Sequence, residues 1–165
     1  MTHDASILYA RATEADIPAV VDLCMLVEAQ HEAYWPLRWQ RREGLREGYA
    51  HWLSRRLADA RMLIAVAREV GTSAEPVVGA LLATIEKEIP IYTYGEYALV
   101  QDMAVRETHR RRGIAQRLLA DAAVWARGQG VNQLRLMVAA QNPTGRAAFE
   151  KAGFLPTYQE MVLPL

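Results

Sequence analysis

The sequence contains one cysteine, no long apolar run and no excess of charge of either sign. Cys24 has no second cysteine with which to form an intrachain disulfide, which fits a reducing compartment. No apolar stretch reaches the roughly 18 residues that a membrane-spanning helix requires. The start of the chain, residues 1–5, lacks the basic and apolar segments of a secretion signal. These absences predict a cytoplasmic protein that has no membrane partner.

The balance of charge argues against a nucleic-acid-binding protein, and the scarcity of metal-ligating residues argues against a metal-binding one. Nineteen Lys and Arg residues match nineteen Asp and Glu residues, so the chain has no net charge. The arginines gather in two groups, at 38–46 and 110–112, but with no net charge and no interleaved exposed aromatic side chains we expect no nucleic-acid partner. The four histidines are not accompanied by an array of Cys, Asp or Glu at ligand spacing, which predicts that there is no metal site.

The chain of 165 residues shows no repeat and no linker, so we expect a single domain over residues 1–165. Hydrophobic periodicity predicts strands over residues 7–11, 62–67, 77–86, 97–105, 134–138 and 154–163. It predicts helices from about 17 to a break at 34–36, and over about 45–57, 114–127 and 143–152. A turn over 71–76 is expected to join the second and third strands. This order indicates an α/β fold, strictly α+β, with a three-strand meander in its middle.

The most informative stretch runs from Asp102 to Leu119, where an apolar strand enters an Arg- and Gly-bearing turn that opens into an amphipathic helix. Backbone N–H groups at a helix start lack intrahelical partners and lie at the positive end of the helix dipole. Such a junction binds anions, and phosphate is the usual one. Gly113 has no Cβ and would allow the backbone to approach that anion closely.

A second motif follows this turn and consists of Asn142, Gly145, Phe149, Lys151 and Gly153-Phe154. Together with the Arg-x-x-Gly-x-Ala turn at 110–115, it resembles the GNAT superfamily of acetyl-CoA-dependent N-acetyltransferases over residues 97–154. The resemblance implies a mixed central sheet of about six to seven strands, splayed between the fourth and fifth, with about four helices. It also implies acetyl-CoA as co-substrate and an amine acceptor as the other partner. A homodimer is compatible with the resemblance.

The resemblance assigns particular residues to coenzyme A. Backbone N–H groups of the turn would bind the pyrophosphate, at Arg111, Arg112, Gly113, Ile114, Ala115 and Gln116. The end of the preceding strand would bind the pantetheine arm through its main chain, at Met103, Ala104 and Val105. Asn142 would contact the same arm, and Phe149 would pack against the coenzyme.

Two positions depart from the family pattern and leave the catalytic groups open. Family members commonly have a Tyr that acts as general acid where this chain has Phe149. Many also have a Glu on the central strand where this chain has Leu99. The substitutes that we name are Asp102, Glu96 and Tyr158. For Asp102, a structural role in holding neighbouring loops accounts for the carboxylate as well as a catalytic role does. Strand alternation would turn its side chain away from the face of Gln101, Met103 and Val105.

The leading prediction is transfer of an acetyl group from acetyl-CoA to a primary amine by direct attack in a ternary complex. Because both usual catalytic side chains are missing, a non-catalytic acyl-CoA-binding or regulatory protein is the alternative. Acidic residues Glu86, Glu88, Glu96 and Asp102 favour a cationic acceptor, whereas the arginine-rich second helix suits one that carries a carboxylate.

Overall fold

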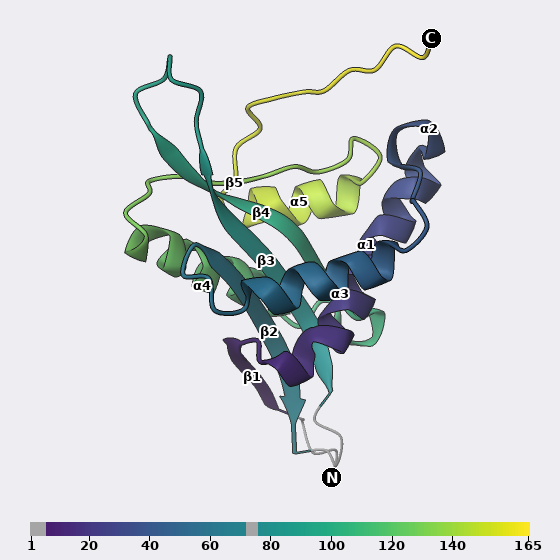
Figure 1. The fold of residues 1–165 in the computed structure, drawn as a ribbon, viewed down its shortest axis with the longest axis vertical. Coiled ribbons are helices and arrows are strands. Elements are labelled where there is room, and N and C mark those ends of the chain that lie inside the picture. The colour runs from purple at the N-terminus through teal and green to yellow at the C-terminus, as the bar shows by residue number, and fades with distance from the viewer. Residues whose placement is uncertain (1–5, 72–75) are drawn as a thin grey trace.

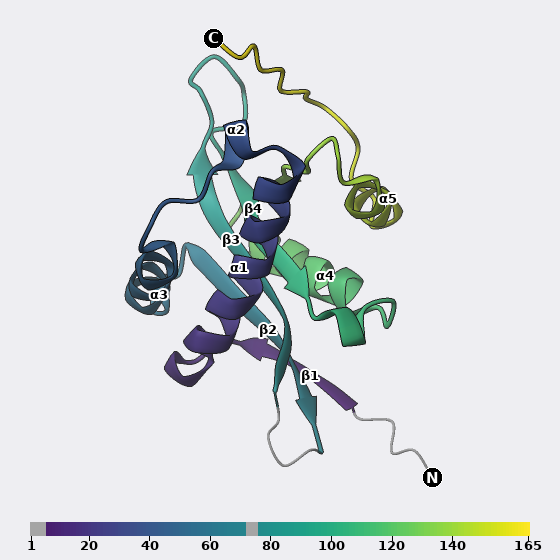
Figure 2. The ribbon, with the colours of Figure 1, turned by 90° about the vertical axis from the view of Figure 1, so that its right-hand side faces the viewer.

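A five-stranded sheet runs through the centre of the structure, with helices on both of its faces (Figures 1 and 2). The computed structural model describes residues 6–71 and 76–165. The strands are β1 (Ser6–Arg11), β2 (Met62–Val70), β3 (Val77–Lys87), β4 (Glu96–Val105) and β5 (Leu134–Leu136). The helices are α1 (Ile17–Tyr34), α2 (Pro36–Trp39), α3 (Leu45–Arg56), α4 (Ile114–Gly128) and α5 (Pro143–Lys151). The short 3-10 turns η1 (Glu14–Asp16) and η2 (Glu107–His109) lie before α1 and α4.

Strand order in the sheet follows the chain. The first four strands pair antiparallel, and β5 joins β4 in parallel after the crossover through α4. Two parallel neighbours require such a crossover, because a tight turn cannot join strands that run the same way. α1 and α3 cover one face of the sheet, and α4 covers the other (Figure 2). We call these the α1 face and the α4 face.

The hairpin of β2 and β3 forms the middle of the core. Residues 62–67 and 77–85 are buried without interruption, since helices cover this hairpin on both faces. On the α1 face the fully buried side chains include Val20, Leu23, Leu53, Val66 and Leu82. On the α4 face they include Val78, Leu81, Ile114, Leu118 and Ala122. None of the described helices is long and apolar enough to span a bilayer.

A β-bulge in β4 determines which side chains face α1. Leu82 pairs with Asp102, but the next residue of β3, Ala83, pairs with Val100, so Gln101 has no partner of its own. An extra residue in one strand reverses the alternation of side chains beyond it. Val100 therefore lies in the α4-face core together with Met103 and Val105, while Ala104 packs on the α1 face.

The bulge also corrects one expectation from simple alternation. Asp102 does lie on the face opposite Met103 and Val105, and it contacts α3. Gln101, however, shares the α1 face with Asp102, because its amide donates to the hydroxyl of Thr84 at 2.9 Å. Thr84 pairs across the sheet with Met62, which belongs to the α1-face core. Both residues of the bulge thus point towards the same helices.

The sheet has five strands among the described residues instead of the expected six to seven. The strand predicted over 154–163 does not form; the C-terminal segment runs away from the sheet and exposes Leu155, Met161 and Leu163 (Figure 1). Pro156 provides no N–H for a ladder. An ion pair between Arg38 and Glu160, 3.1 Å long, holds this segment near α2.

Three smaller predictions also change. β5 ends at Leu136 rather than at 138. The described chain has five α-helices instead of about four, because Trp35 is extended and Pro36 then begins the extra helix α2. The turn expected over 71–76 lies largely outside the described residues, and so does the N-terminal segment 1–5.

Asp16 fixes the entry to α1 and supplies a stability prediction. Its carboxylate accepts the backbone N–H of Thr13 at 2.8 Å and pairs with Arg68. Burial raises the pKa of Asp16, but the hydrogen bonds from Thr13 and Arg68 outweigh that effect and hold the pKa below its ordinary value. Asp16→Asn is therefore expected to lower the free energy of unfolding by about 1–3 kcal/mol at neutral pH.

Urea unfolding at two pH values tests this expectation. The lowered pKa means that the ionised Asp16 stabilises the fold above the ordinary pKa of 3.8 and loses this contribution as the pH falls through the folded value. The difference between wild type and Asp16→Asn should therefore shrink in acid. An equal difference at neutral and acidic pH would show that the charge of Asp16 is not what stabilises the cap.

Candidate functional site

The turn between β4 and α4 leaves several backbone donors without partners. Gly113 has φ 78° and ψ 2°, and Arg111 also has a positive φ of 63°. The first helical bond runs from Arg117 N–H to Gly113 O at 3.1 Å. In the described chain, the N–H groups of Arg111 and of residues 113–116 donate to no acceptor. This end of α4 therefore presents a cluster of donors to an anion.

The basic side chains around this turn have different partners. Arg110 turns back and donates to the carbonyl of Val105 at 3.2 Å. His109 lies 3.2 Å from Glu69, and the Arg112 guanidinium lies 3.9 Å from the same carboxylate. The side chains of Arg110 and His109 thus brace the turn against β4 and β2. The backbone of the turn is the part that matches an anion.

The end of β4 has one backbone edge without a strand beside it. β3 pairs with β4 up to Val105, whereas β5 pairs with β4 only from Ala98 to Val100. Beyond Val100, no described strand lies on the β5 side of Met103, Ala104 and Val105. Main-chain groups on an open strand edge can bond an extended ligand as an added strand would. The predicted pantetheine residues therefore lie where such a ligand could pair.

Asn142 and Phe149 belong to α5 and have structural contacts there. Asn142 is the N-cap, and its Oδ1 accepts the backbone N–H of Gly145 at 2.8 Å. A Cβ on residue 145 would lie 2.5 Å from Asn142 Nδ2, so this cap requires glycine. The ring of Phe149 packs edge-to-face against Phe154 at 6.1 Å and against the α4-face core. Residue 149 therefore supports the sheet edge and carries no proton to donate.

A cluster of polar side chains lies on the α1 face of β4, next to this open edge. Asp102 is 8% exposed, and its Oδ2 accepts the hydroxyl of Tyr49 from α3 at 3.0 Å. The same hydroxyl lies 3.2 Å from Oε1 of Glu28 on α1. We call Glu28, Tyr49 and Asp102 the carboxylate cluster. A pocket of about 390 Å³, lined by Arg42, Leu45, Gly48, Tyr49 and Trp52, borders it.

Burial makes Asp102 a proton acceptor suited to neutral pH. Removal from water raises the pKa of Asp102 to about 6; the Tyr49 hydrogen bond lowers it, and the charge of Glu28 raises it again. Burial raises the pKa of Tyr49 as well, so this side chain stays a neutral hydroxyl. A carboxylate that is ionised just above pH 6 can take a proton from a reacting group in neutral solution.

The structure separates the other two catalytic candidates from the cluster. Glu96 begins β4, about 20 Å along the strand from Asp102, and pairs with Arg61 at 2.7 Å. Tyr158 is 85% exposed on the C-terminal segment. Glu86 lies on the α1 face, where it accepts the Thr84 hydroxyl at 2.6 Å. Only Asp102, of the three candidates, is buried beside the end of β4.

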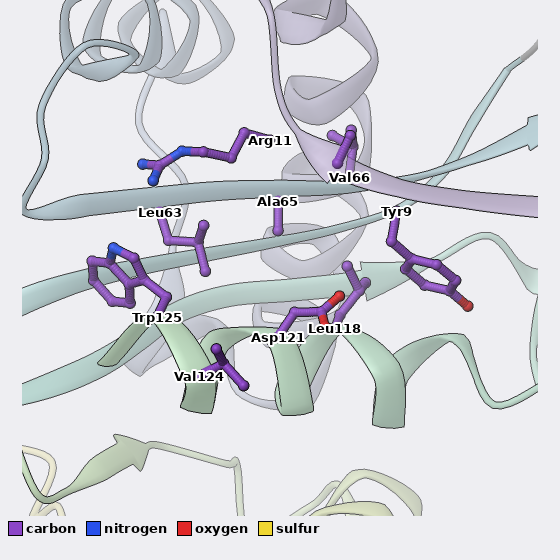
Figure 3. Close-up of a pocket in the computed structure, with 10 residues that line it drawn as sticks. Tyr9, Arg11, Leu63, Ala65, Val66, Leu118, Asp121, Val124 and Trp125 are labelled. Atoms are coloured by element: carbon purple, nitrogen blue, oxygen red, sulfur yellow. The ribbon is translucent and has the colours of Figure 1, made fainter. Parts of the chain in front are cut away.

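A second pocket has no connection with these residues. It measures about 320 Å³ and lies between β1, β2 and α4 (Figure 3). Its apolar wall includes Leu63 and Trp125, while Asp121 projects from α4 and Tyr9 from β1 (Figure 3). Neither the turn nor the carboxylate cluster contributes a lining residue. In the part of the chain that the structure describes, no three His, Cys, Asp or Glu side chains gather as metal ligands would.

Sequence reasoning missed Glu28 and Tyr49. Tyr49 falls within the helix predicted over about 45–57, and its ring packs on the α1-face core, but helical periodicity says nothing about the partner of its hydroxyl. Glu28 follows Cys24 by one helical turn and lies beside the apolar stripe of α1. A carboxylate at the border of an apolar helix face was the signal that could have identified Glu28. Its partner Tyr49 lies 21 residues further along the chain, so no local pattern links the two.

Comparison with known proteins agrees with this geometry. No curated protein matches the sequence. The structure resembles an aminoglycoside 6'-N-acetyltransferase from Acinetobacter baumannii, with TM-score 0.74, 18% identity, and coverage of 97% of this chain and 98% of that one. A predicted acetyltransferase with acetyl-CoA from Clostridium acetobutylicum gives TM-score 0.74, 18% identity and 96% coverage of both chains.

A third similar structure is glucosamine-6-phosphate N-acetyltransferase from Arabidopsis thaliana, with TM-score 0.71, 13% identity, and coverage of 96% and 98%. At these identities the likeness establishes the fold. The sequence profile of the acetyltransferase (GNAT) family matches residues 22–154. Because this match covers most of the sequence, the chain belongs to the GNAT family of acyltransferase enzymes.

Proposed function

We propose that this protein transfers an acetyl group from acetyl-CoA to a primary amine by direct attack in a ternary complex. The observation that carries the proposal is the position of Asp102. This buried carboxylate lies on β4, directly before the open strand edge at Met103–Val105 and the donor-rich turn at 111–116. An acyl-carrier site and a proton acceptor thus adjoin on one strand.

The residues present fit coenzyme A. The unpartnered N–H groups at the start of α4 suit its pyrophosphate, and nothing lies within 4 Å of where a Cβ on residue 113 would be, so the backbone there is open to a ligand. The edge of β4 at residues 103–105 would pair with the pantetheine arm. Two similar structures were obtained with CoA or acetyl-CoA.

Acetyl-CoA supplies a thioester whose acyl carbon accepts the amine nitrogen, and the thiolate leaves with a proton. The chain's own part is to orient the arm, polarise the acyl oxygen with a backbone N–H near Met103 or Ala104, and take up the ammonium proton at Asp102. Tyr158 and Glu96 have no step here, because neither lies near the cluster. The leaving thiolate can take its proton from the acylated nitrogen itself.

The carboxyl groups around the pocket suit a cationic amine as the acceptor. Glu28 and Asp102 place two carboxyl groups at the hydroxyl of Tyr49, which lines the pocket, and Glu86 adds a third carboxyl group further along the α1 face of the sheet. Similar structures include aminoglycoside acetyltransferases and a glucosamine-6-phosphate acetyltransferase, whose acceptors are amino sugars by name. We therefore propose an amino sugar or a comparable polyamine. The cytoplasmic location and the homodimer expected from the sequence remain part of this proposal.

Calorimetry with acetyl-CoA and a thiol-release assay together test the function. The assay would screen amino sugars, polyamines, amino acids and peptides as acceptors, and turnover with a cationic amine is expected. Binding of acetyl-CoA without turnover on any amine would favour the non-catalytic alternative, which the apolar Phe149 and Leu99 motivate. Failure to bind acetyl-CoA at all would contradict both functions.

A further inference from the structure

The hydroxyl of Tyr49 lies between two carboxyl groups and has one proton to donate. It is 3.0 Å from Asp102 Oδ2 and 3.2 Å from Glu28 Oε1. If both carboxyl groups were ionised, the hydroxyl could bond only one of them, and the other contact would join two acceptors. Both contacts become hydrogen bonds when one carboxyl group holds a proton. The arrangement therefore suits a cluster that holds one proton in transit between its two carboxyl groups.

The two ends of the cluster differ in their access to water. Asp102 is 8% exposed, whereas Glu28 is half-buried on α1. Within the part of the chain that the structure describes, the Asp102 carboxyl group has one side-chain hydrogen bond, that from Tyr49. Neither Asp102 nor Glu28 forms an ion pair there. A proton on Asp102 can thus pass along hydrogen bonds through the Tyr49 hydroxyl to Glu28, which is more accessible to water.

The groups that face Asp102 from the surrounding elements leave this route intact. From α1, Cys24 is buried, and that burial raises the pKa of its thiol, so it remains neutral. From β3, the residue paired with Asp102 is the apolar Leu82. On β4 itself, the amide of Gln101 turns to Thr84 and Glu86. Glu28 and Tyr49 are therefore the ionisable groups that set the state of Asp102.

We propose that Tyr49 relays the acceptor's proton from Asp102 to Glu28 during each turnover, an inference that rests on the proposed acetyl transfer. The ammonium gives its proton to the Asp102 carboxylate. Asp102 then donates this proton to Tyr49 Oη while the Tyr49 hydroxyl proton passes to the Glu28 carboxylate, and Glu28 releases it to water. One proton leaves for each amine acetylated, and the carboxylate cluster returns to its starting state. Tyr49 and Glu28 are positioning residues, since they act through Asp102.

The pH profiles of two variants test the relay. The Tyr49 hydrogen bond lowers the pKa of Asp102 and the charge of Glu28 raises it. Tyr49→Phe should therefore move the acidic limb of kcat/KM to higher pH, and Glu28→Gln should move it to lower pH. Each variant should also lower kcat about tenfold with little change in KM for the amine. Opposite displacements would not follow from loss of packing.

Matched variants control for the substitutions themselves. Tyr9→Phe removes a hydroxyl from a tyrosine in the distant β1 pocket, and Glu32→Gln removes a charge one turn further along α1. Both should retain wild-type kcat and pH limbs. Tyr49→Phe keeps the ring that packs edge-on against Trp52 at 6.0 Å, so it should fold.

A titration that needs no substrate separates failure of the relay from failure of the proposed function. Carbon-13 NMR of labelled Asp and Glu carboxyl groups follows Asp102, with Asp102→Asn assigning its signal. The Asp102 titration should move up in Tyr49→Phe and down in Glu28→Gln. These displacements without turnover on any amine would contradict the acetyl-transfer function. Turnover whose kcat and acidic limb are unchanged in both variants would overturn the relay.

Discussion

Asp102→Asn is expected to lower kcat about 100-fold or more while making the protein more stable at neutral pH. The loss follows because the amide cannot accept the ammonium proton. The gain follows because the carboxylate is removed from water without a cation among its described contacts. The buried charge that we propose for the reaction is thus one that the fold would be more stable without.

The sign of the stability change depends on pH. Burial raises the pKa of Asp102 from its ordinary 3.8 to about 6. Between these values the folded protein keeps a proton that the unfolded chain releases, so stability falls as the pH rises through this window. Above it, the ionised Asp102 costs on the order of 3 kcal/mol. Asp102→Asn should therefore be more stable than wild type near neutral pH and similar to it in acid.

Urea unfolding and thiol release on the same samples measure both effects. Asp22→Asn is the matched control, because Asp22 is a half-exposed residue on α1 that pairs with Arg46 at 2.7 Å. It should change neither quantity much, since exposed ion pairs contribute about 1 kcal/mol or less. A destabilised Asp102→Asn at neutral pH would mean that the carboxylate mainly holds α3 against the sheet.

Gly113→Val should weaken acetyl-CoA binding about 10- to 100-fold. Gly113 has φ 78°, where a β-branched residue costs about 1–3 kcal/mol. No atom lies within 4 Å of a Cβ placed there, so the new side chain would meet the ligand rather than the protein. The backbone must either stay strained or rotate its N–H groups away from the phosphates.

Gly130→Val is the control for that strain. Gly130 has φ 79°, equally open surroundings, and a position just beyond the other end of α4. Both variants should lose similar stability in a thermal melt, while calorimetry should show weaker acetyl-CoA binding for Gly113→Val alone. Equal affinity in the two variants would place the pyrophosphate elsewhere.

The local structure around the turn was predicted correctly because it depends on residues close together in the sequence. The turn at 110–115 and the start of α4 follow from arginine and glycine next to an amphipathic helix. The carboxylate cluster was missed because Tyr49 and Asp102 are 53 residues apart and meet only when α3 packs on the sheet. The strand predicted over 154–163 shows the converse limit: an apolar pattern specifies a strand only where an edge pairs with it.

The bulge at Gln101 separates the register of the first part of β4 from that of the second part. Removing Gln101 would restore regular alternation, with Val100 on the α4 face and Asp102 still opposite Leu82 on the α1 face. Scanning by substitution would leave this spacing untouched. The bulge is therefore a place where β4 can lose one residue without moving Asp102, and a relative one residue shorter here could keep a carboxylate in the same position.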